Sequence, residues 1–296
     1  MVEDRTFGAR LFDVFNVTLM VALALVCILP FIHITAVSFS ETAPVVGNLV
    51  RFWPKDFTLE NYKISLENEK LWRAFGWSIA RVVVGTSLHM FFCILAAYPM
   101  SRPTRVFRAH NIVIGLFLFA NLFDGGMLAR FVVVRWVGLY DKFLGIVIPS
   151  MITTGSIILI MNYFRSLPQE LEEAALIDGA THFDVLFRVF VPISTPIIAT
   201  ITLFTMVGLW NDWFQPMLYL RDASRYPLQT YLQAFINSVD IRQLFTQGEL
   251  EQFLAIVSNR ALRSATLVIA TVPILLVYPF LQKYYVTGLK LGAVKE

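Results

Sequence analysis

Residues 166–192 gather carboxylates in a pattern that favours binding to another protein. Glu170, Glu172 and Glu173 place three acids within four positions, near the expected start of a short helix, where the helix dipole stabilises negative charge. The alternative is an amphipathic loop on the membrane surface, but such helices are usually basic because anionic headgroups repel carboxylates. Ala174-Ala175 adds a smooth patch. We therefore predict that this segment packs closely against a protein partner.

Local signals divide this segment into two short helices. Ser166, with Gln169 three residues later, fits a capping box and predicts that the first helix begins there. Gly179 predicts its end, because glycine readily takes the left-handed cap conformation. Thr181, followed by Asp184, predicts the cap of a second helix.

A second chemically distinct group lies within an apolar stretch. Indole rings can stack on sugar rings, and an amide or carboxylate can bind sugar hydroxyls, so this group is a candidate substrate contact. The equally weighted alternative is that it packs against a partner subunit or lies at an interface. The four residues are Trp210, Asn211, Asp212 and Trp213.

One cation, Arg81, lies a few residues inside another apolar stretch. A charge within the membrane is a functional candidate by default. A long side chain near the end of a span can also extend to water. We favour the second interpretation and predict that Arg81 reaches the aqueous surface.

Catalytic chemistry has no recognisable site in this sequence. No stretch matches the phosphate-binding pattern G-x-x-x-x-G-K-[ST], and no nucleophile is paired with a base. The histidines and cysteines lack metal-ligand spacing. We predict that the chain is not an enzyme and has no catalytic residues, metal or cofactor of its own. The residues considered are His33, His89, His110, His182, Cys27 and Cys93.

The composition requires a membrane to position these groups. The chain is 57% hydrophobic and only 15% charged, whereas soluble domains average about 25% charged residues. Its net charge of +3 gives no case for nucleic acid. We predict an all-α integral membrane protein, a single transmembrane domain over residues 1–296 with about six helices, since a span needs about 20 apolar residues. The six stretches are residues 11–37, 71–98, 112–131, 143–164, 197–220 and 261–285.

The distribution of basic residues in short loops gives the orientation. Arg102, Arg105 and Arg108 lie in a short loop without acids, and such loops face the cytoplasm. An even number of spans then predicts that both termini, and residues 166–192, are cytoplasmic. The third stretch is the least regular, because Asp124-Gly125-Gly126 interrupts it.

The acidic loop contains Glu173-Ala174-Ala175, then Asp178-Gly179-Ala180, then Phe187-x-Val189-x-Val191-Pro192. These three elements in this order resemble the EAA motif of ABC importer permeases, the inner-membrane components of binding-protein-dependent transport systems. The resemblance implies that residues 166–192 form the coupling helix region that docks into a cytoplasmic ATPase subunit. The implied coupling residues are Glu172, Glu173, Ala174, Ala175, Asp178, Gly179, Ala180, Phe187 and Pro192. Where this chain has Val189 and Val191, family members often have Ile and Leu, a conservative change.

Two further stretches resemble the MalG/LplC-like carbohydrate branch of that family. They are the Trp-Asn-Asp segment at residues 210–212 and the ending at residues 283–295, and residues 123–127 are similar to a Gly-Gly segment of the branch. The resemblance implies several partners: a second homologous permease subunit, two ATPase subunits that bind ATP and Mg, and an extracytoplasmic solute-binding protein. It also implies a bacterial cytoplasmic (inner) membrane as the location.

The expected function is therefore half of a translocation pathway for a carbohydrate, with an oligosaccharide as the family expectation. The alternatives are a self-sufficient secondary transporter or channel, which should show inverted repeats or paired intramembrane carboxylates, and a structural membrane protein. Four arginines near outer ends of spans could attract an anionic sugar, although docking to a binding protein or loop solvation is favoured. They are Arg130, Arg135, Arg221 and Arg225.

Overall fold

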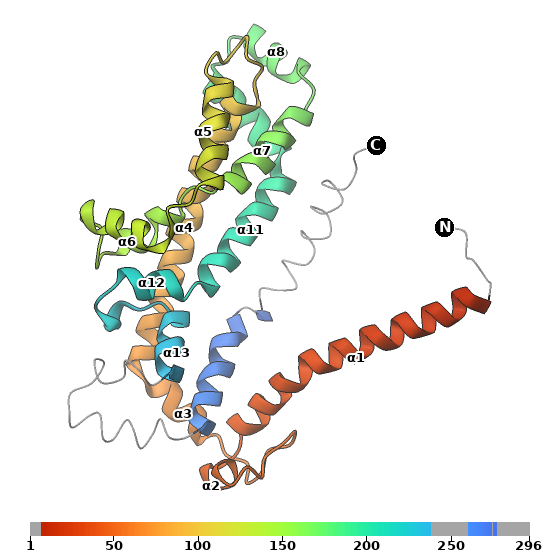
Figure 1. Ribbon diagram of the computed structural model, residues 1–296, viewed down its shortest axis with the longest axis vertical. Helices are drawn as coiled ribbons and strands as arrows, with labels where there is room; N and C mark the ends of the chain where they lie inside the picture. Colours follow the sequence, from red (N-terminus) through yellow and green to blue (C-terminus); the bar gives the residue numbers. More distant parts are fainter. Residues whose placement is uncertain (1–6, 238–259, 274, 277–296) are drawn as a thin grey trace. The chain divides into compact units, whose positions relative to one another are not determined.

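The computed structural model describes residues 7–237, 260–273 and 275–276 (Figure 1). These residues are helical or irregular, and their only extended pairing is one isolated bridge between Ser40 and Phe57. The chain divides into two compact units. Unit 1 comprises residues 1–69 and 235–273, and unit 2 comprises residues 70–234 and 274–296.

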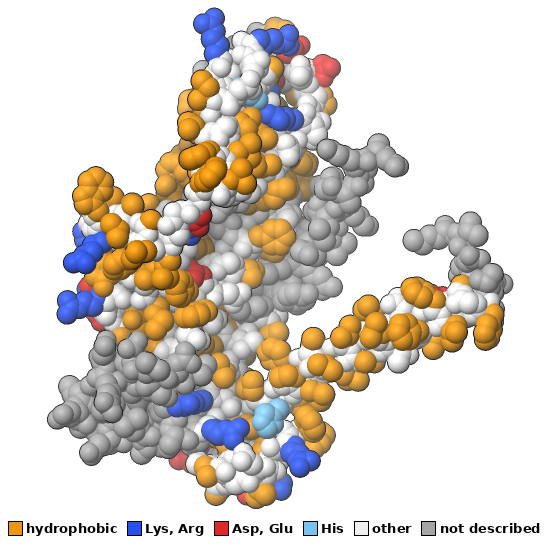
Figure 2. Space-filling view, in the orientation of Figure 1, with side chains coloured by type: hydrophobic (Ala, Val, Ile, Leu, Met, Phe, Trp, Pro, Cys, Tyr) orange, Lys and Arg blue, Asp and Glu red, His pale blue; other side chains and the backbone are white. Residues whose placement is uncertain are grey.

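Unit 1 holds α1 and a small packed region after it. The apolar window of α1 is 0% buried, and its hydrophobic side chains cover the helix along its length (Figure 2). Beyond α1, Ser65 and Thr266 share a hydroxyl hydrogen bond of 3.1 Å. The elements are α1 (Phe7–Ser38), α2 (Thr42–Val46), α3 (Glu60–Glu67) and a helical segment at residues 260–273.

Unit 2 is built around α4, which has 33 residues and passes the length of the unit (Figure 1). The other helices are α5 (His110–Leu122), α6 (Gly126–Trp136), α7 (Thr154–Ser166), α8 (Glu170–Ile177), α9 (His182–Asp184), α10 (Val191–Ile193), α11 (Thr195–Asn211), α12 (Phe214–Tyr219) and most of α13 (Leu228–Asn237); α4 itself is Glu69–Ser101. Three 3₁₀ helices lie at Phe143–Ile146, Ile148–Ser150 and Ala223–Arg225, and a π-helical turn at Val185–Phe190.

The first two predicted spans are confirmed as continuous helices, and the next three differ from the prediction. Within the described residues, α1 and α4 are long and apolar enough to cross a membrane, or up to five spans exist if each bent helix pair counts as one. The third stretch breaks at residues 123–125, where α5 and α6 meet at 115°. The fourth bends by 47° before α7. The fifth ends as a helix at Asn211, and the sixth lies partly outside the described residues.

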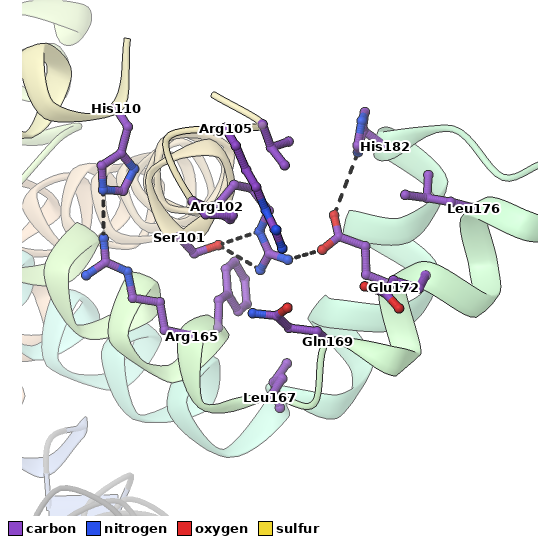
Figure 3. Close-up of a pocket in the computed structure, with 14 residues that line it drawn as sticks. Ser101, Arg102, Arg105, His110, Arg165, Leu167, Gln169, Glu172, Leu176 and His182 are labelled. Carbon is purple, nitrogen blue, oxygen red and sulfur yellow. Dashed lines mark hydrogen bonds and ion pairs between the residues drawn. The ribbon is translucent and has the colours of Figure 1, made fainter. Parts of the chain in front are cut away.

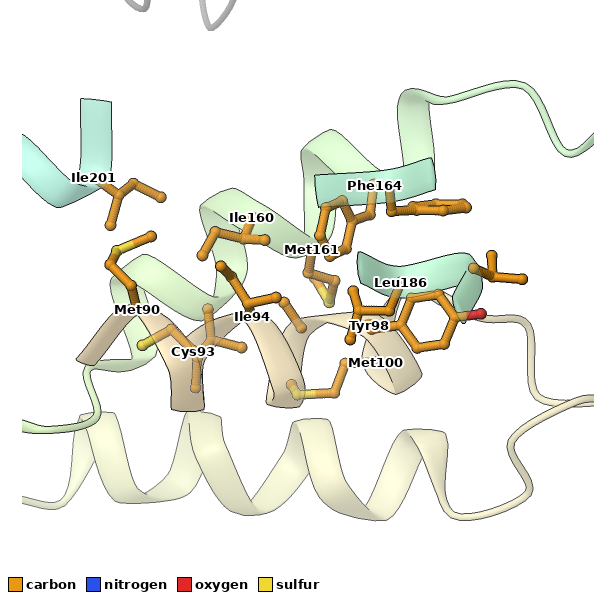
Figure 4. Close-up of a cluster of buried hydrophobic side chains, with 14 residues drawn as sticks. Met90, Cys93, Ile94, Tyr98, Met100, Ile160, Met161, Phe164, Leu186 and Ile201 are labelled. Atoms are coloured by element: carbon orange, nitrogen blue, oxygen red, sulfur yellow. The ribbon is translucent and has the colours of Figure 1, made fainter. Parts of the chain in front are cut away.

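The main hydrophobic core of unit 2 joins α4 to α7 and to the segment that follows α8 (Figure 4). Cys93, Ile157 and Ile160 are fully buried at its centre. Phe164 and Phe190 pack edge to face, with ring centroids 5.4 Å apart. Close packing makes such a core rigid, so the acidic loop is attached to a stiff support and not to a free tether.

Candidate functional site

Helix α8 forms the acidic end of unit 2, far from α12 (Figure 1). Three acids, Glu170, Glu172 and Glu173, occupy its first turn, which is where the dipole favours them. The helix ends as predicted, since Gly179 follows it with a φ of +84°. The predicted start is wrong: Ser166 is the last residue of α7, and its hydroxyl donates to the Tyr163 carbonyl at 2.7 Å.

The second predicted cap is confirmed. Thr181 Oγ1 accepts from the Asp184 amide at 3.3 Å, while Asp184 Oδ2 accepts from the Thr181 amide at 3.2 Å. The helix that follows is mainly the π-helical turn at Val185–Phe190. Its wider winding places Leu186 and Phe190 in the core.

The Glu172 side chain extends from α8 toward the end of α4 (Figure 3). Its carboxylate forms an ion pair with Arg102 and accepts a hydrogen bond from the Tyr98 hydroxyl at 3.0 Å. His182 Nδ1 lies 3.2 Å from the same hydroxyl. The Glu172 side chain is only 13% exposed. Sequence analysis did not pair these residues, because Tyr98 and Arg102 lie about 70 positions away.

Arg102 is itself fixed on several sides. Its Nε and Nη2 donate to the Ser101 hydroxyl at 3.0 and 2.9 Å. Its guanidinium lies 5.1 Å from the Tyr98 ring centre and 4.7 Å from that of Phe190, distances typical of cation–π contacts. Arg102 was predicted only as a loop charge. It is instead the anchor that ties α4 to α8.

The remaining coupling residues differ in how much they expose. Glu173 and Ala174 are exposed. The Glu173 side chain has no ion pair or hydrogen bond within the described part of the chain, and its backbone amide donates to the Gln169 carbonyl at 3.1 Å. Ala175 and Ala180 pack against the core. Exposed or partly exposed positions that a partner could reach are Asp178, Gly179, Phe187 (42% exposed) and Pro192. A cavity of about 490 Å³ lies between α8 and residues 101–110 (Figure 3).

Arg81 contradicts the sequence prediction, because it does not reach water. The side chain is fully buried, and Nη2 lies 2.6 Å from Asp212 Oδ2. Its other nitrogens donate to three carbonyls: Ile146 at 3.1 Å, Leu209 at 3.3 Å and Asp212 at 3.0 Å. A buried cation needs such pairing, and these acceptors lie 65 to 131 positions away.

The ion pair between Arg81 and Asp212 caps two helix ends at once. Carbonyls in the last turn of a helix lack partners within the helix, and Arg81 binds that of Leu209 in α11. Asp212 Oδ1 accepts from the amides of Phe214 and Gln215, at the start of α12. The pair therefore stabilises the break between α11 and α12.

The four residues of the candidate sugar contact do not form one cluster. Trp210 packs edge to face on Phe75, with centroids 5.6 Å apart, and its Nε1 is buried without a hydrogen-bond partner among the described residues. Asn211 is exposed, and Trp213 is 39% exposed. Of the four, Asp212 lines a cavity.

That cavity, named here the broken-span cavity, has a volume of about 1080 Å³ and lies where helices are interrupted. Asp124 lines it from the break between α5 and α6, Ser150 from the turn before α7, and Asp212 from the break between α11 and α12. Gln215 and Arg130 also line it. Of these five residues, the sequence indicated only Arg130 and Asp212 as candidate substrate contacts.

The loops beyond α6 and α12 are held together by ion pairs. Arg225 Nη1 lies 3.6 Å from Asp141 Oδ2, and Arg225 Nε lies 3.4 Å from Asp222 Oδ2. Hydrogen bonds from Ser224 hold the pKa of Asp222 below its usual range. Asp222 therefore keeps its charge, and its pairing with Arg225, in mildly acidic surroundings.

Comparison with known proteins identifies relatives over nearly the whole chain. Residues 74–291 match the family described as binding-protein-dependent transport system inner membrane component. Protein LplC of Bacillus subtilis is 39% identical, over 98% of this chain and 97% of its own length. The polygalacturonan/rhamnogalacturonan transport system permease protein YtcP of the same organism is 35% identical, over 97% and 99%.

A solved structure has the same fold. It is a bacterial ABC transporter involved in the import of the acidic polysaccharide alginate, and the matching chain is 31% identical with a TM-score of 0.86. The match covers 95% of this chain and 98% of that chain.

Proposed function

Because this chain belongs to the family of binding-protein-dependent transport system inner membrane components, we propose that it forms half of a carbohydrate pathway driven by a separate ATPase. The self-sufficient transporter considered from the sequence does not fit this family. An oligosaccharide substrate is favoured, since the similar proteins include permeases or importers named for polygalacturonan, rhamnogalacturonan and alginate.

The observation that carries the coupling proposal is the different placement of two neighbouring acids. Glu172 is paired internally with Arg102, whereas the Glu173 side chain is exposed and has no ion pair among the described residues. An exposed carboxylate beside small alanines suits a basic cleft in a partner. We assign Glu173 to the ATPase contact and Glu172 to holding α8 on α4.

The rigid attachment of α8 supports the mechanism. The ion pair with Arg102 and the core of Figure 4 connect α8 with α4 and α7. A movement of α8 in a docked ATPase would therefore displace these helices as a body. Closure of the ATPase on ATP would be converted into alternating access of the pathway.

We also propose the membrane topology and the partner subunits that the resemblance implies. Six spans would place both termini, the loop at residues 102–108 and residues 166–192 in the cytoplasm. A second homologous permease would complete the pathway, and two ATPase subunits would bind ATP and Mg. An extracytoplasmic binding protein would deliver the carbohydrate. The unburied apolar surface of α1 supports contact with lipid or with the second permease.

The experiment compares two variants of adjacent residues. In the complex purified from membranes, Glu173→Lys should lower co-purification of the ATPase, since losing one partner of a docked charge pair costs about 2–5 kcal/mol. It should leave the thermal stability of this chain unchanged, because Glu173 is exposed. Glu172→Gln is the matched control and should lower that stability by disrupting the Arg102 pair.

Both variants should insert normally, because neither residue lies in an apolar stretch. Measured together, membrane level, ATPase co-purification and substrate-stimulated ATP hydrolysis separate docking from folding. Wild-type docking and hydrolysis in Glu173→Lys would show that α8 is not the coupling element proposed here.

A further inference from the structure

We infer that the broken-span cavity is where this subunit contacts an acidic oligosaccharide, and that Arg130 binds a sugar carboxylate there. The inference rests on the proposed function and adds to it the charge of the substrate and the residue that recognises it.

The position of the cavity is the first argument. Backbone without helical hydrogen bonds is tolerated within a membrane only where it is buried in protein or lines a water-filled cavity, and interrupted helices mark binding sites in transporters. Here three separate interruptions, represented by Asp124, Ser150 and Asp212, line one cavity. Its volume of about 1080 Å³ exceeds that of most small-ligand pockets, which leaves room for several sugar units.

The uncharged lining suits sugar hydroxyls. Ser150 Oγ donates to Gln215 Oε1 at 2.9 Å, which leaves the Gln215 amide nitrogen as a donor. Thr153 Oγ1 donates to Ser156 Oγ at 2.9 Å. The Ser156 hydroxyl also lies 3.0 Å from His89 Nε2. The Ser150 and Thr153 hydroxyls can each accept a further hydrogen bond, and the Gln215 amide nitrogen can donate one, without leaving their neighbours.

The charged groups that line the cavity differ in how many of their hydrogen-bonding positions already have a partner. Asp212 is saturated by Arg81 and by two backbone amides. Arg130 is 56% exposed and uses a single nitrogen, Nη2, to bind Asp124 Oδ2 at 2.6 Å. A guanidinium has five N–H donors in a planar fork that fits a carboxylate. The other edge of Arg130 has no partner among the residues that the structure describes.

The other arginines named from the sequence are placed differently. Arg225 is engaged by Asp141 and Asp222. Arg135 and Arg221 do not line the cavity. Arg130 is thus the outer arginine whose guanidinium is available to a ligand in this space.

Asp124 gives the contact a suitable strength. A transport site must bind its substrate and also release it. Asp124 partly neutralises Arg130 and is itself fixed by the Gly126 amide at 3.0 Å. The Arg130 contact is therefore directional, but weaker than that of an unpaired cation.

The test measures uptake by the complete transporter in proteoliposomes, with trigalacturonate as the acidic probe and maltotriose as the neutral one. Arg130→Gln should raise KM for trigalacturonate by about tenfold or more, the effect of losing one charged hydrogen bond. Arg130→Lys should recover part of the loss. Asp124→Asn, which retains an acceptor for Gly126, should lower KM, because Arg130 then carries an unopposed charge.

Arg135→Gln is the matched control, since it removes an α6 arginine that does not line the cavity, and it should leave KM unchanged. Equal effects of Arg130→Gln and Arg135→Gln, or none from Arg130→Gln, would overturn the inference. The inference would also be overturned if the unmodified transporter took up maltotriose but not trigalacturonate, or took up neither probe. In those cases, reduced co-purification of the ATPase in Glu173→Lys would still support the proposed function. Wild-type co-purification of the ATPase in Glu173→Lys would contradict the proposed function itself.

Discussion

Replacing Arg81 tests whether the buried ion pair stabilises the helix break in unit 2. Arg81→Met keeps an unbranched apolar side chain, two heavy atoms shorter than that of arginine, but leaves Asp212 without its cation and three carbonyls without their donor. Removing one partner of a buried pair costs about 3–5 kcal/mol. Asp212 is 24% exposed, so water compensates part of the loss, and we expect about 3 kcal/mol. That is a large fraction of the 5–15 kcal/mol typical of a folded domain.

The chain contains its own reporter for this measurement. Cys93 is buried in unit 2 and Cys27 is exposed, so a Cys27→Ser background leaves one thiol that reacts only when unit 2 opens. Labelling with a maleimide during heating, followed by separation of this chain on a gel, gives the unfolding temperature in the purified complex. Arg81→Met should lower this temperature by several degrees.

A double-mutant cycle distinguishes the pair from general damage. Combining Arg81→Met with Asp212→Asn should cost less than the sum of the single changes, because both charges are then absent. Arg73→Met is the control on the same helix, since Arg73 is exposed, and it should change stability by less than about 0.5 kcal/mol. A neutral Arg81→Met, or additive single effects, would refute the role assigned to the pair.

Two further predictions concern the turn after α8 and the membrane topology of the chain. Gly179→Ala should weaken coupled uptake while leaving membrane insertion intact, because φ is +84° and the left-handed conformation costs other residues about 1–2 kcal/mol, although space for the methyl group exists. Comparable uptake in the variant and wild type would show that this turn is not critical. Single cysteines at Arg105 and Lys63 should react oppositely with an impermeant thiol reagent in spheroplasts, position 63 labelling and position 105 not. Labelling of position 105 would invert the topology.

The sequence alone determined features that depend on neighbouring residues. Composition specified a membrane protein, because few charges cannot cover a soluble surface of this size. The end of α8 at Gly179 and the Thr181–Asp184 cap follow from backbone preferences within a few positions. The coupling segment was recognisable for the same reason, since its motif is continuous in the chain.

Only the tertiary structure decided which charges are internal and which are available. Glu172 and Glu173 are adjacent and chemically identical, yet Arg102 binds the first and leaves the second exposed. Serine is a residue type that favours a helix N-cap, but Ser166 is the last residue of α7, because that helix extends through it.

Arg81 shows the physical reason most clearly. Its sequence position allowed a route to water, but the acceptors that bury it come from residues 146, 209 and 212. An expectation based on a stretch of sequence treats each helix separately and takes no account of contacts between helices. The interruptions of α5, α7 and α11, and the cavity they line, depend on contacts between those helices. A broken helix is stable only when another part of the chain binds the backbone groups that the break exposes, so it is specified by the packed fold.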